Sequence, residues 1–142
     1  MTTLTYDQVK GLVKGHNKST IVSDQLVIAL IWKESAFNDA AINPSTTATG
    51  LMQVTKGAVD DVNNNTPQGI HFSYDDRQDA AKNIECGTYY LDLRIGWANG
   101  DVKKGLEGYG TGTGYADNIL AAETCLKADG SNWKACLNAI HS

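Results

Sequence analysis

The sequence predicts an all-α domain built around a buried central helix. Residues 26–32 are apolar on every side of a helix, as expected for a helix that crosses the middle of a domain. A second segment, residues 80–98, carries apolar residues at three- and four-residue intervals, and no segment alternates as a strand would. With 142 residues, of which 42% are hydrophobic, the chain 1–142 is expected to form one domain.

The first half of the chain predicts three helices. Thr5 and Gln8 have the spacing of a capping box, so a first helix should begin there and end within residues 15–18. Ser23 is a suitable N-cap for the central helix. Loops rich in Asn, Ser, Thr and Gly follow, and they enclose a short helix over residues 56–62.

The second half of the chain begins with a long helix, expected from Asp75 onward. Its apolar stripe consists of Ala80, Ile84, Gly87, Leu91, Ile95 and Ala98. A glycine costs about 1 kcal/mol relative to alanine within a helix. Gly87 on the stripe therefore predicts that another helix approaches closely at this point.

Three shorter helices should follow. Asp101 can cap the first, the glycine-rich residues 108–114 end it, residues 115–126 form the second, and Ser131 can cap the last. Cys125 and Cys136 flank the turn between the last two helices. They are either a disulfide, with Cys86 as a free thiol, or small buried hydrophobic residues.

Composition excludes several classes of function. The net charge of −4 and scattered Lys and Arg residues give no basic surface for nucleic acid. No apolar run is long enough to cross a membrane, and the N-terminus lacks the features of a secretory signal. The three cysteines and three histidines fit no zinc spacing, so neither a metal nor a cofactor is expected.

Glu34 is the candidate catalytic residue. It follows Val27, Leu30 and Ile31 at helical spacing, which places its carboxyl group on the apolar stripe of the central helix. Burial raises the pKa of a carboxyl group, and a protonated glutamate can act as the general acid in cleaving a glycosidic bond. The alternative is a solvated carboxylate at the helix end, beside Lys33.

Four motifs then occur in a fixed order. They are Glu34-Ser35, then Gly50-Leu51-Met52-Gln53, then Asn83-Ile84 with Gly87 and Tyr90-Leu91, then Tyr109 with Gly112. Over roughly residues 20–120 the chain thereby resembles the soluble lytic transglycosylase family, which is related to goose-type lysozymes. The fourth motif departs from the family pattern Ala-Tyr-Asn-Ala-Gly, because Gly110 stands at the Asn position.

The resemblance implies a lysozyme-like fold and cleavage of the β-1,4 bond between N-acetylmuramic acid and N-acetylglucosamine in peptidoglycan. It implies that Glu34 is the acid and base, that Ser35 and Gln53 contact the sugar or an intermediate, that Met52 lines the cleft, and that Tyr109 is oriented toward Glu34. The expected partner is the peptidoglycan glycan strand, bound by a monomer in the bacterial periplasm or cell wall. Without a signal, delivery by a phage or a specialised secretion route is expected, and an injected toxin would need an inhibitor protein.

Three functions remain open on the sequence. A transglycosylase needs only Glu34 and releases 1,6-anhydro-N-acetylmuramic acid, as the resemblance implies. A hydrolytic muramidase needs a second carboxylate, for which Asp39, Asp60 and Asp61 are the candidates. A non-catalytic peptidoglycan-binding module would keep the cleft without turnover, and the altered fourth motif supports it.

Overall fold

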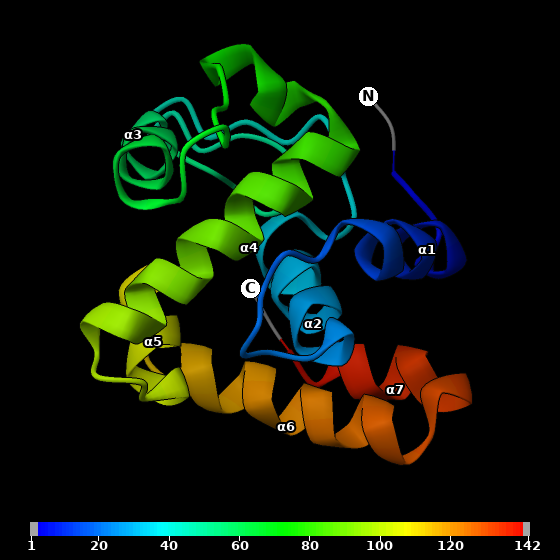
Figure 1. Ribbon diagram of the computed structural model, residues 1–142. Helices are drawn as coiled ribbons and strands as arrows, with labels where there is room; N and C mark the ends of the chain where they lie inside the picture. The colour runs from blue at the N-terminus through cyan, green and yellow to red at the C-terminus, as the bar shows by residue number, and fades with distance from the viewer. Residues whose placement is uncertain (1–2, 141–142) are drawn as a thin grey trace.

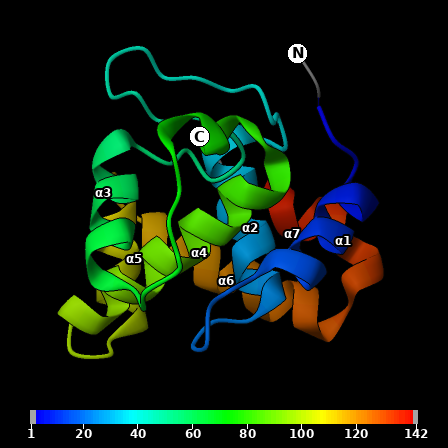
Figure 2. The same ribbon diagram turned by 45° about the horizontal axis from the view of Figure 1, so that its top comes forward.

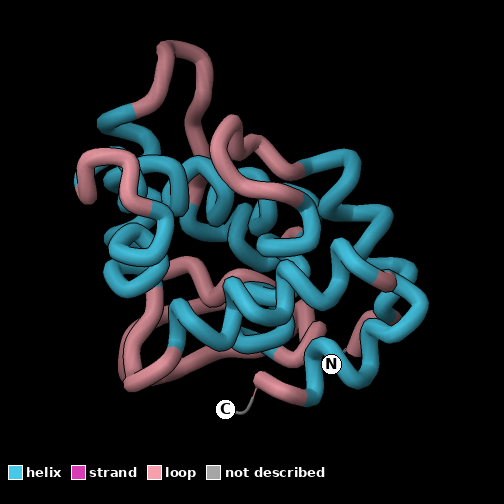
Figure 3. Tube along the Cα trace, turned by 90° about the horizontal axis from the view of Figure 1, so that it is seen from below, coloured by secondary structure: helices cyan, strands magenta, loops and turns pink. Residues whose placement is uncertain are grey.

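The computed structural model describes residues 3–140, which fold into helices joined by loops (Figure 1). The α-helices are α1 (Tyr6–His16), α2 (Asp24–Ser35), α3 (Lys56–Asn65), α4 (Ala80–Trp97), α5 (Val102–Tyr109), α6 (Tyr115–Ala128) and α7 (Trp133–Asn138). Two 3₁₀ helices, η1 (Tyr74–Gln78) and η2 (Gly130–Asn132), precede α4 and α7. The all-α prediction is confirmed, and Figure 3 shows only helices and loops over the described residues.

The central helix is α2, as predicted. The Ser23 hydroxyl accepts a hydrogen bond from the Leu26 N–H, and residues 26–31 are buried on every side. Helices α1 and α6 pack against it, and Figure 1 shows α2 in the middle of the molecule. The helix ends at Ser35 because Ala36 and Phe37 adopt left-handed backbone angles, with φ of 50° and 67°. Glu34 therefore lies in the last turn of α2.

Helix α4 begins later than the sequence indicated. Residues 74–78 form η1, and a new helix starts after Asp79, whose carboxylate accepts a hydrogen bond from the Lys82 N–H. Ser73 and Asp76 form their own capping box around η1. The capping residue Asp79 breaks the segment in two, because an N-cap residue has extended rather than helical backbone angles.

Gly87 does mark a close approach, but the neighbour is not a helix. A Cβ atom at Gly87 would lie 2.5 Å from the sulfur of Met52, which belongs to the loop between α2 and α3. This loop runs along one side of the molecule in Figure 2, and isolated β-bridges pair some of its residues. The stripe of α4 identifies the buried face of the helix but not the element that covers it.

The C-terminal region is tied to the rest of the molecule at several points. Cys125 in α6 and Cys136 in α7 form the predicted disulfide, with Cα atoms 5.5 Å apart, and Cys86 is a buried free thiol. Trp133 stacks on Tyr6 of α1, with ring centroids 4.6 Å apart. The prediction that Ser131 caps the last helix is wrong.

Ser131 lies within η2, where it donates to the Asp129 carboxylate. Helix α7 begins at Trp133 without a side-chain cap. In the turn before it, the Asp129 carboxylate accepts a hydrogen bond from the Ser131 N–H. No helix among residues 3–140 is long and apolar enough to span a membrane. The same residues contain no group of three or more His, Cys, Asp or Glu side chains that could hold a metal ion.

Candidate active site

Glu34 is a partly buried carboxyl group at the end of the most buried helix. Burial raises its pKa above the ordinary value, while the hydrogen bond from Tyr115 and the charge of Lys33 act in the opposite direction. Burial is the largest of these effects because it removes water from the charged form. The carboxyl group is therefore biased toward its protonated form, as a proton donor requires.

The hydroxyl group of Tyr115 donates a hydrogen bond to Oε2 of Glu34, at 2.5 Å. Tyr115 is the first residue of α6 and is 4% exposed. Burial and the nearby Glu34 carboxyl raise the pKa of Tyr115 well above its ordinary value. The phenol is therefore neutral near pH 7 and remains a hydrogen-bond donor.

Tyr109 lies near Glu34 but makes a different hydrogen bond. Its hydroxyl group donates to the carbonyl oxygen of Met52, at 2.7 Å, and its ring packs against Tyr90. Burial raises its pKa well above the ordinary value, so it too is a neutral donor. Tyr115 thus donates the hydrogen bond to Glu34, whereas Tyr109 lines the same hollow as Glu34 and bonds to Met52.

Met52 does not line the cleft with its side chain, in contrast to the expectation. The residue is fully buried, and its thioether packs on Gly87. Its N–H donates to Asn83 Oδ1 at 2.8 Å, and Asn83 Nδ2 in turn donates to the carbonyl oxygens of Thr49 and Arg77. Met52 and Asn83 are therefore part of the frame that holds the loop before α3 against α4.

Ser35 and Gln53 both donate hydrogen bonds to backbone carbonyl oxygens. The Ser35 hydroxyl donates to the Ile31 carbonyl oxygen at 3.0 Å, within α2. Gln53 has a left-handed backbone (φ 50°), and its amide Nε2 donates to the carbonyl oxygens of Ala41 and Gly50. Ser35 lines one hollow that also contains Glu34, and Gln53 lines a second hollow that contains Glu34 as well.

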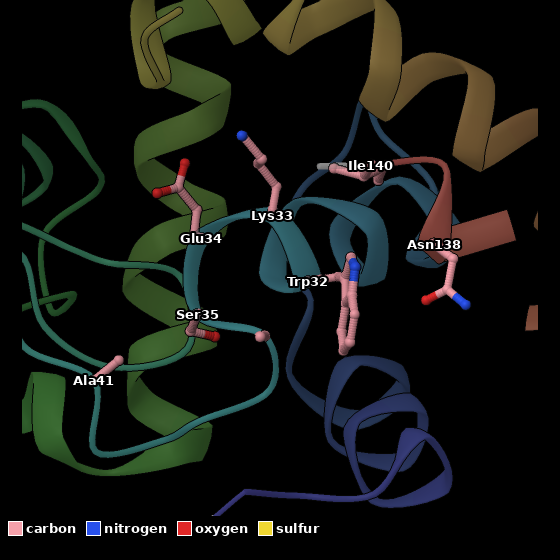
Figure 4. A pocket seen from close by; sticks show the side chains of 8 residues that line it. Trp32, Lys33, Glu34, Ser35, Ala41, Asn138 and Ile140 are labelled. Atoms are coloured by element: carbon pink, nitrogen blue, oxygen red, sulfur yellow. The ribbon is translucent and has the colours of Figure 1, made fainter. Parts of the chain in front are cut away.

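These two hollows meet at Glu34. The larger one, about 620 Å³, extends from Glu34 past Trp32 to Asn138 and Ile140. Figure 4 shows Glu34 on the α4 side of the α2 end, with Trp32, Asn138 and Ile140 on the other side. The second, about 390 Å³, extends toward Gln53, Tyr109 and Thr111. A polymer chain that filled both would pass across the Glu34 carboxyl group.

Within the part of the chain that the structure describes, no second carboxylate lines these hollows. Among the described residues that line them, Glu34 is the one acidic side chain. Asp39 lines a separate hollow with Thr49 and Gln78. Asp60 lies on α3, where its carboxylate accepts a hydrogen bond from the Tyr74 hydroxyl at 2.8 Å. Asp61, on the same helix, lines neither hollow.

The sequence did not single out Tyr115 or the bonding role of Asn83. The sequence alone does not distinguish Tyr115 from the other aromatic residues, because sugar stacking and core packing both use aromatic side chains. Asn83 belongs to the third motif, for which the resemblance implies no side-chain role. The signal for Asn83 was its chemistry: an amide on the apolar stripe of α4 needs hydrogen-bond partners if it is buried.

Comparison with solved structures supports the fold. The chain is similar to the 70 kDa soluble lytic transglycosylase SLT70 from Escherichia coli, with a TM-score of 0.61 and 19% identity over 96% of this chain and 23% of that one. It is also similar to a 70-kDa soluble lytic transglycosylase in complex with bulgecin A, with a TM-score of 0.63 and 22% identity over 94% and 21% of the two chains. The expected lysozyme-like fold is confirmed.

The chain spans less than a quarter of the length of either solved protein. No curated protein matches it significantly. Residues 12–129, however, match the family described as the transglycosylase SLT domain. This match includes Glu34, both hydrogen-bonded tyrosines and the Asn83 frame, and the chain therefore belongs to the transglycosylase SLT domain family.

Proposed function

We propose that the protein is a lytic transglycosylase that cleaves the β-1,4 bond between N-acetylmuramic acid and N-acetylglucosamine in peptidoglycan, with Glu34 as acid and base. The observation that carries the proposal is the position of Glu34, whose carboxyl group has a raised pKa and lies where two hollows meet. Within residues 3–140, no other acidic side chain lines either hollow. Membership of the family supports the substrate class. The site of action is then the bacterial cell wall.

The reaction needs one carboxyl group. Glu34 donates its proton to the glycosidic oxygen as the C1–O bond of the muramic acid breaks, and it becomes a carboxylate. The carboxylate then takes the proton of the 6-hydroxyl group of the same sugar. The O6 atom bonds to C1 and closes the 1,6-anhydro ring. The proton given in the first step is recovered in the second, and no water is consumed.

The surrounding residues suit these two steps. The Tyr115 hydroxyl donates to Glu34 and stabilises the carboxylate that forms after the first transfer. Ser35 and Gln53 line different hollows that share Glu34, which supports a role for each in contacting the sugars next to the broken bond. Met52 would act through its backbone, as the acceptor for Tyr109.

Hydrolysis is the second candidate reaction, and the placement of the acidic residues disfavours it. A hydrolase of the two-carboxylate type has its second carboxyl group across the scissile bond, at about 5–10 Å from the first. Asp39, Asp60 and Asp61 line neither hollow that contains Glu34. A pure binding module is disfavoured for another reason: a carboxyl group held where its charge is costly has no use without proton transfer.

Mass spectrometry of the products tests the proposal. The protein is incubated with isolated peptidoglycan, and the soluble fragments are analysed without chemical reduction. A transglycosylase gives fragments ending in 1,6-anhydro-N-acetylmuramic acid, which are lighter by one water than the hydrolysis products. Fragments with reducing muramic acid would replace this proposal with a muramidase, and the absence of any release would favour the binding module.

A further inference from the structure

Tyr109 and Tyr115 stand on either side of the glycine-rich residues 110–114, and they make different hydrogen bonds. Tyr115, at the start of α6, donates its hydroxyl hydrogen to Glu34 Oε2 at 2.5 Å. Tyr109, at the end of α5, donates to the Met52 carbonyl oxygen at 2.7 Å. The Tyr109 hydrogen is therefore already committed to the backbone of the loop before α3, and the hydrogen directed at the carboxyl group belongs to Tyr115.

Gly110 provides the space for the Tyr115 ring. A Cβ atom at Gly110 would lie 2.1 Å from Cζ and 2.2 Å from Cε1 of that ring, far inside van der Waals contact. The backbone of Gly110 has a φ of −116°, which any residue can adopt. Residue 110 must therefore be a glycine because the Tyr115 ring occupies the space of a side chain, and not because of its backbone angles.

Tyr115 is buried at the first position of α6. Tyr115 is 4% exposed, and Gly114 before it has a left-handed backbone (φ 80°) that turns the chain into the helix. The charged and titratable groups around Glu34 are Lys33 on its own helix, Tyr115 from α6 and Tyr109 from α5. Of the two tyrosines, Tyr115 donates a hydrogen bond to the carboxyl group, whereas Tyr109 donates to the Met52 carbonyl oxygen.

We infer that Tyr115 is the positioning residue for Glu34, and that Gly110 is a steric requirement for this role. Tyr115 holds the carboxyl group where the two hollows meet and stabilises its charged form, while Tyr109 holds the loop. The inference rests on the proposed function for its catalytic meaning. The contact itself can be tested without substrate.

The first experiment measures the pKa of Glu34 by NMR, using side-chain carboxyl carbons labelled with ¹³C, and the matched variants Tyr115→Phe and Tyr109→Phe. Removal of a donor from the charged form raises the pKa of the carboxyl group. We expect a higher Glu34 pKa in Tyr115→Phe and a value close to that of the original protein in Tyr109→Phe. Equal shifts, or a shift in Tyr109→Phe alone, would overturn the inference.

The second experiment uses turnover of isolated peptidoglycan. Loss of a hydrogen bond to a charged group is expected to lower kcat in Tyr115→Phe by about tenfold, with KM nearly unchanged. The high-pH limb of the activity profile should move upward, in parallel with the pKa. If the products are hydrolytic, or if no release occurs, the proposed function fails while the NMR result still decides the role of Tyr115.

The third experiment tests Gly110 with Gly110→Ala and Gly110→Asn, the second of which restores the residue of the family pattern. Both should reduce kcat as much as Tyr115→Phe does, because the ring is displaced. In a double variant with Tyr115→Phe the two losses should not add, since they remove the same interaction. Additive losses would separate Gly110 from Tyr115.

Gly96→Ala is the matched control for these glycine variants, because a Cβ atom at Gly96 meets no atom within 4 Å. Circular dichroism and thermal unfolding identify a Gly110 variant that fails to fold. In that case the Tyr115 and Tyr109 pair still decides the main claim.

Discussion

Asn83 and Glu34 are both polar side chains in apolar surroundings, but their hydrogen bonding differs. Asn83 is fully buried and satisfied by the backbone, with bonds to Met52, Thr49 and Arg77. Glu34 accepts a bond from Tyr115 and lies against two hollows, with a raised pKa. A saturated polar group fixes the backbone, whereas a polar group that faces open space can exchange a proton.

The variant Glu34→Gln should show the largest loss of activity. Glutamine keeps the size of the side chain but has no transferable proton, and general acid catalysis is worth about 10²- to 10⁴-fold. Release of soluble fragments from peptidoglycan measures the loss, and Ser35→Ala is the control, with a smaller expected decrease. A Glu34→Gln protein that clears cell walls at the original rate would contradict the catalytic role.

The variant Asn83→Ala should mainly affect stability. It leaves the Met52 N–H and the carbonyl oxygens of Thr49 and Arg77 without their partner, and an unsatisfied buried group costs about 1–3 kcal/mol. Urea unfolding should therefore show a loss of about 3 kcal/mol or more. The exposed Asn64 on α3 is the control, and an equal, small effect of Asn64→Ala and Asn83→Ala would refute the structural role.

The variant Gly87→Ala tests the contact between α4 and Met52 in the loop before α3. The added methyl group would meet the Met52 sulfur, and overpacking of this kind costs about 1–3 kcal/mol. The same change at Gly96, in the exposed part of α4, should stabilise the protein by about 0.5–1 kcal/mol. Thermal unfolding of the two variants should thus shift in opposite directions. A shift in the same direction would mean that Met52 yields without strain.

The smallest effect concerns the pH dependence of stability. The pKa of Glu34 is raised in the folded protein, so the folded state binds this proton more tightly than the unfolded state does. The resulting stabilisation is present at low pH and is lost as the pH rises through the folded pKa. The stability of Glu34→Gln relative to the original protein should therefore increase from pH 4 to pH 8. A relative stability that falls over this range would mean that the folded pKa is lowered.

Local features of the fold could be predicted, but contacts between distant elements could not. The caps at Thr5 and Ser23 depend on hydrogen bonds within three residues, and both were found as expected. The buried face of α4 was also clear from its period, but Gly87 contacts Met52 of a loop, which no periodicity encodes. Short-range chemistry determines where a helix begins, whereas its neighbours depend on the path of the whole chain.

The candidate site shows the same difference between features within one helix, which could be predicted, and contacts between helices, which could not. Helical spacing made Glu34 a candidate, and the four motifs in their fixed order then selected it over a solvated carboxylate at the helix end. Tyr109 and Tyr115 stand on either side of residues 110–114, and which of them bonds to Glu34 depends on how α5 and α6 meet. The Gly110 position was seen as a departure from the family pattern. Its cause, the Tyr115 ring, becomes visible only when both helices are in place.

The disulfide between α6 and α7 has a consequence for the covalent topology of the chain. Residues 125–136 form a closed ring, and its exposed part, residues 128–132, is the turn a protease would reach first. One cut there leaves the two fragments joined, so the segment that carries Asn138 and Ile140 stays attached to α6. On a denaturing gel, such a cleaved protein would migrate as one chain until a reducing agent separates the two fragments.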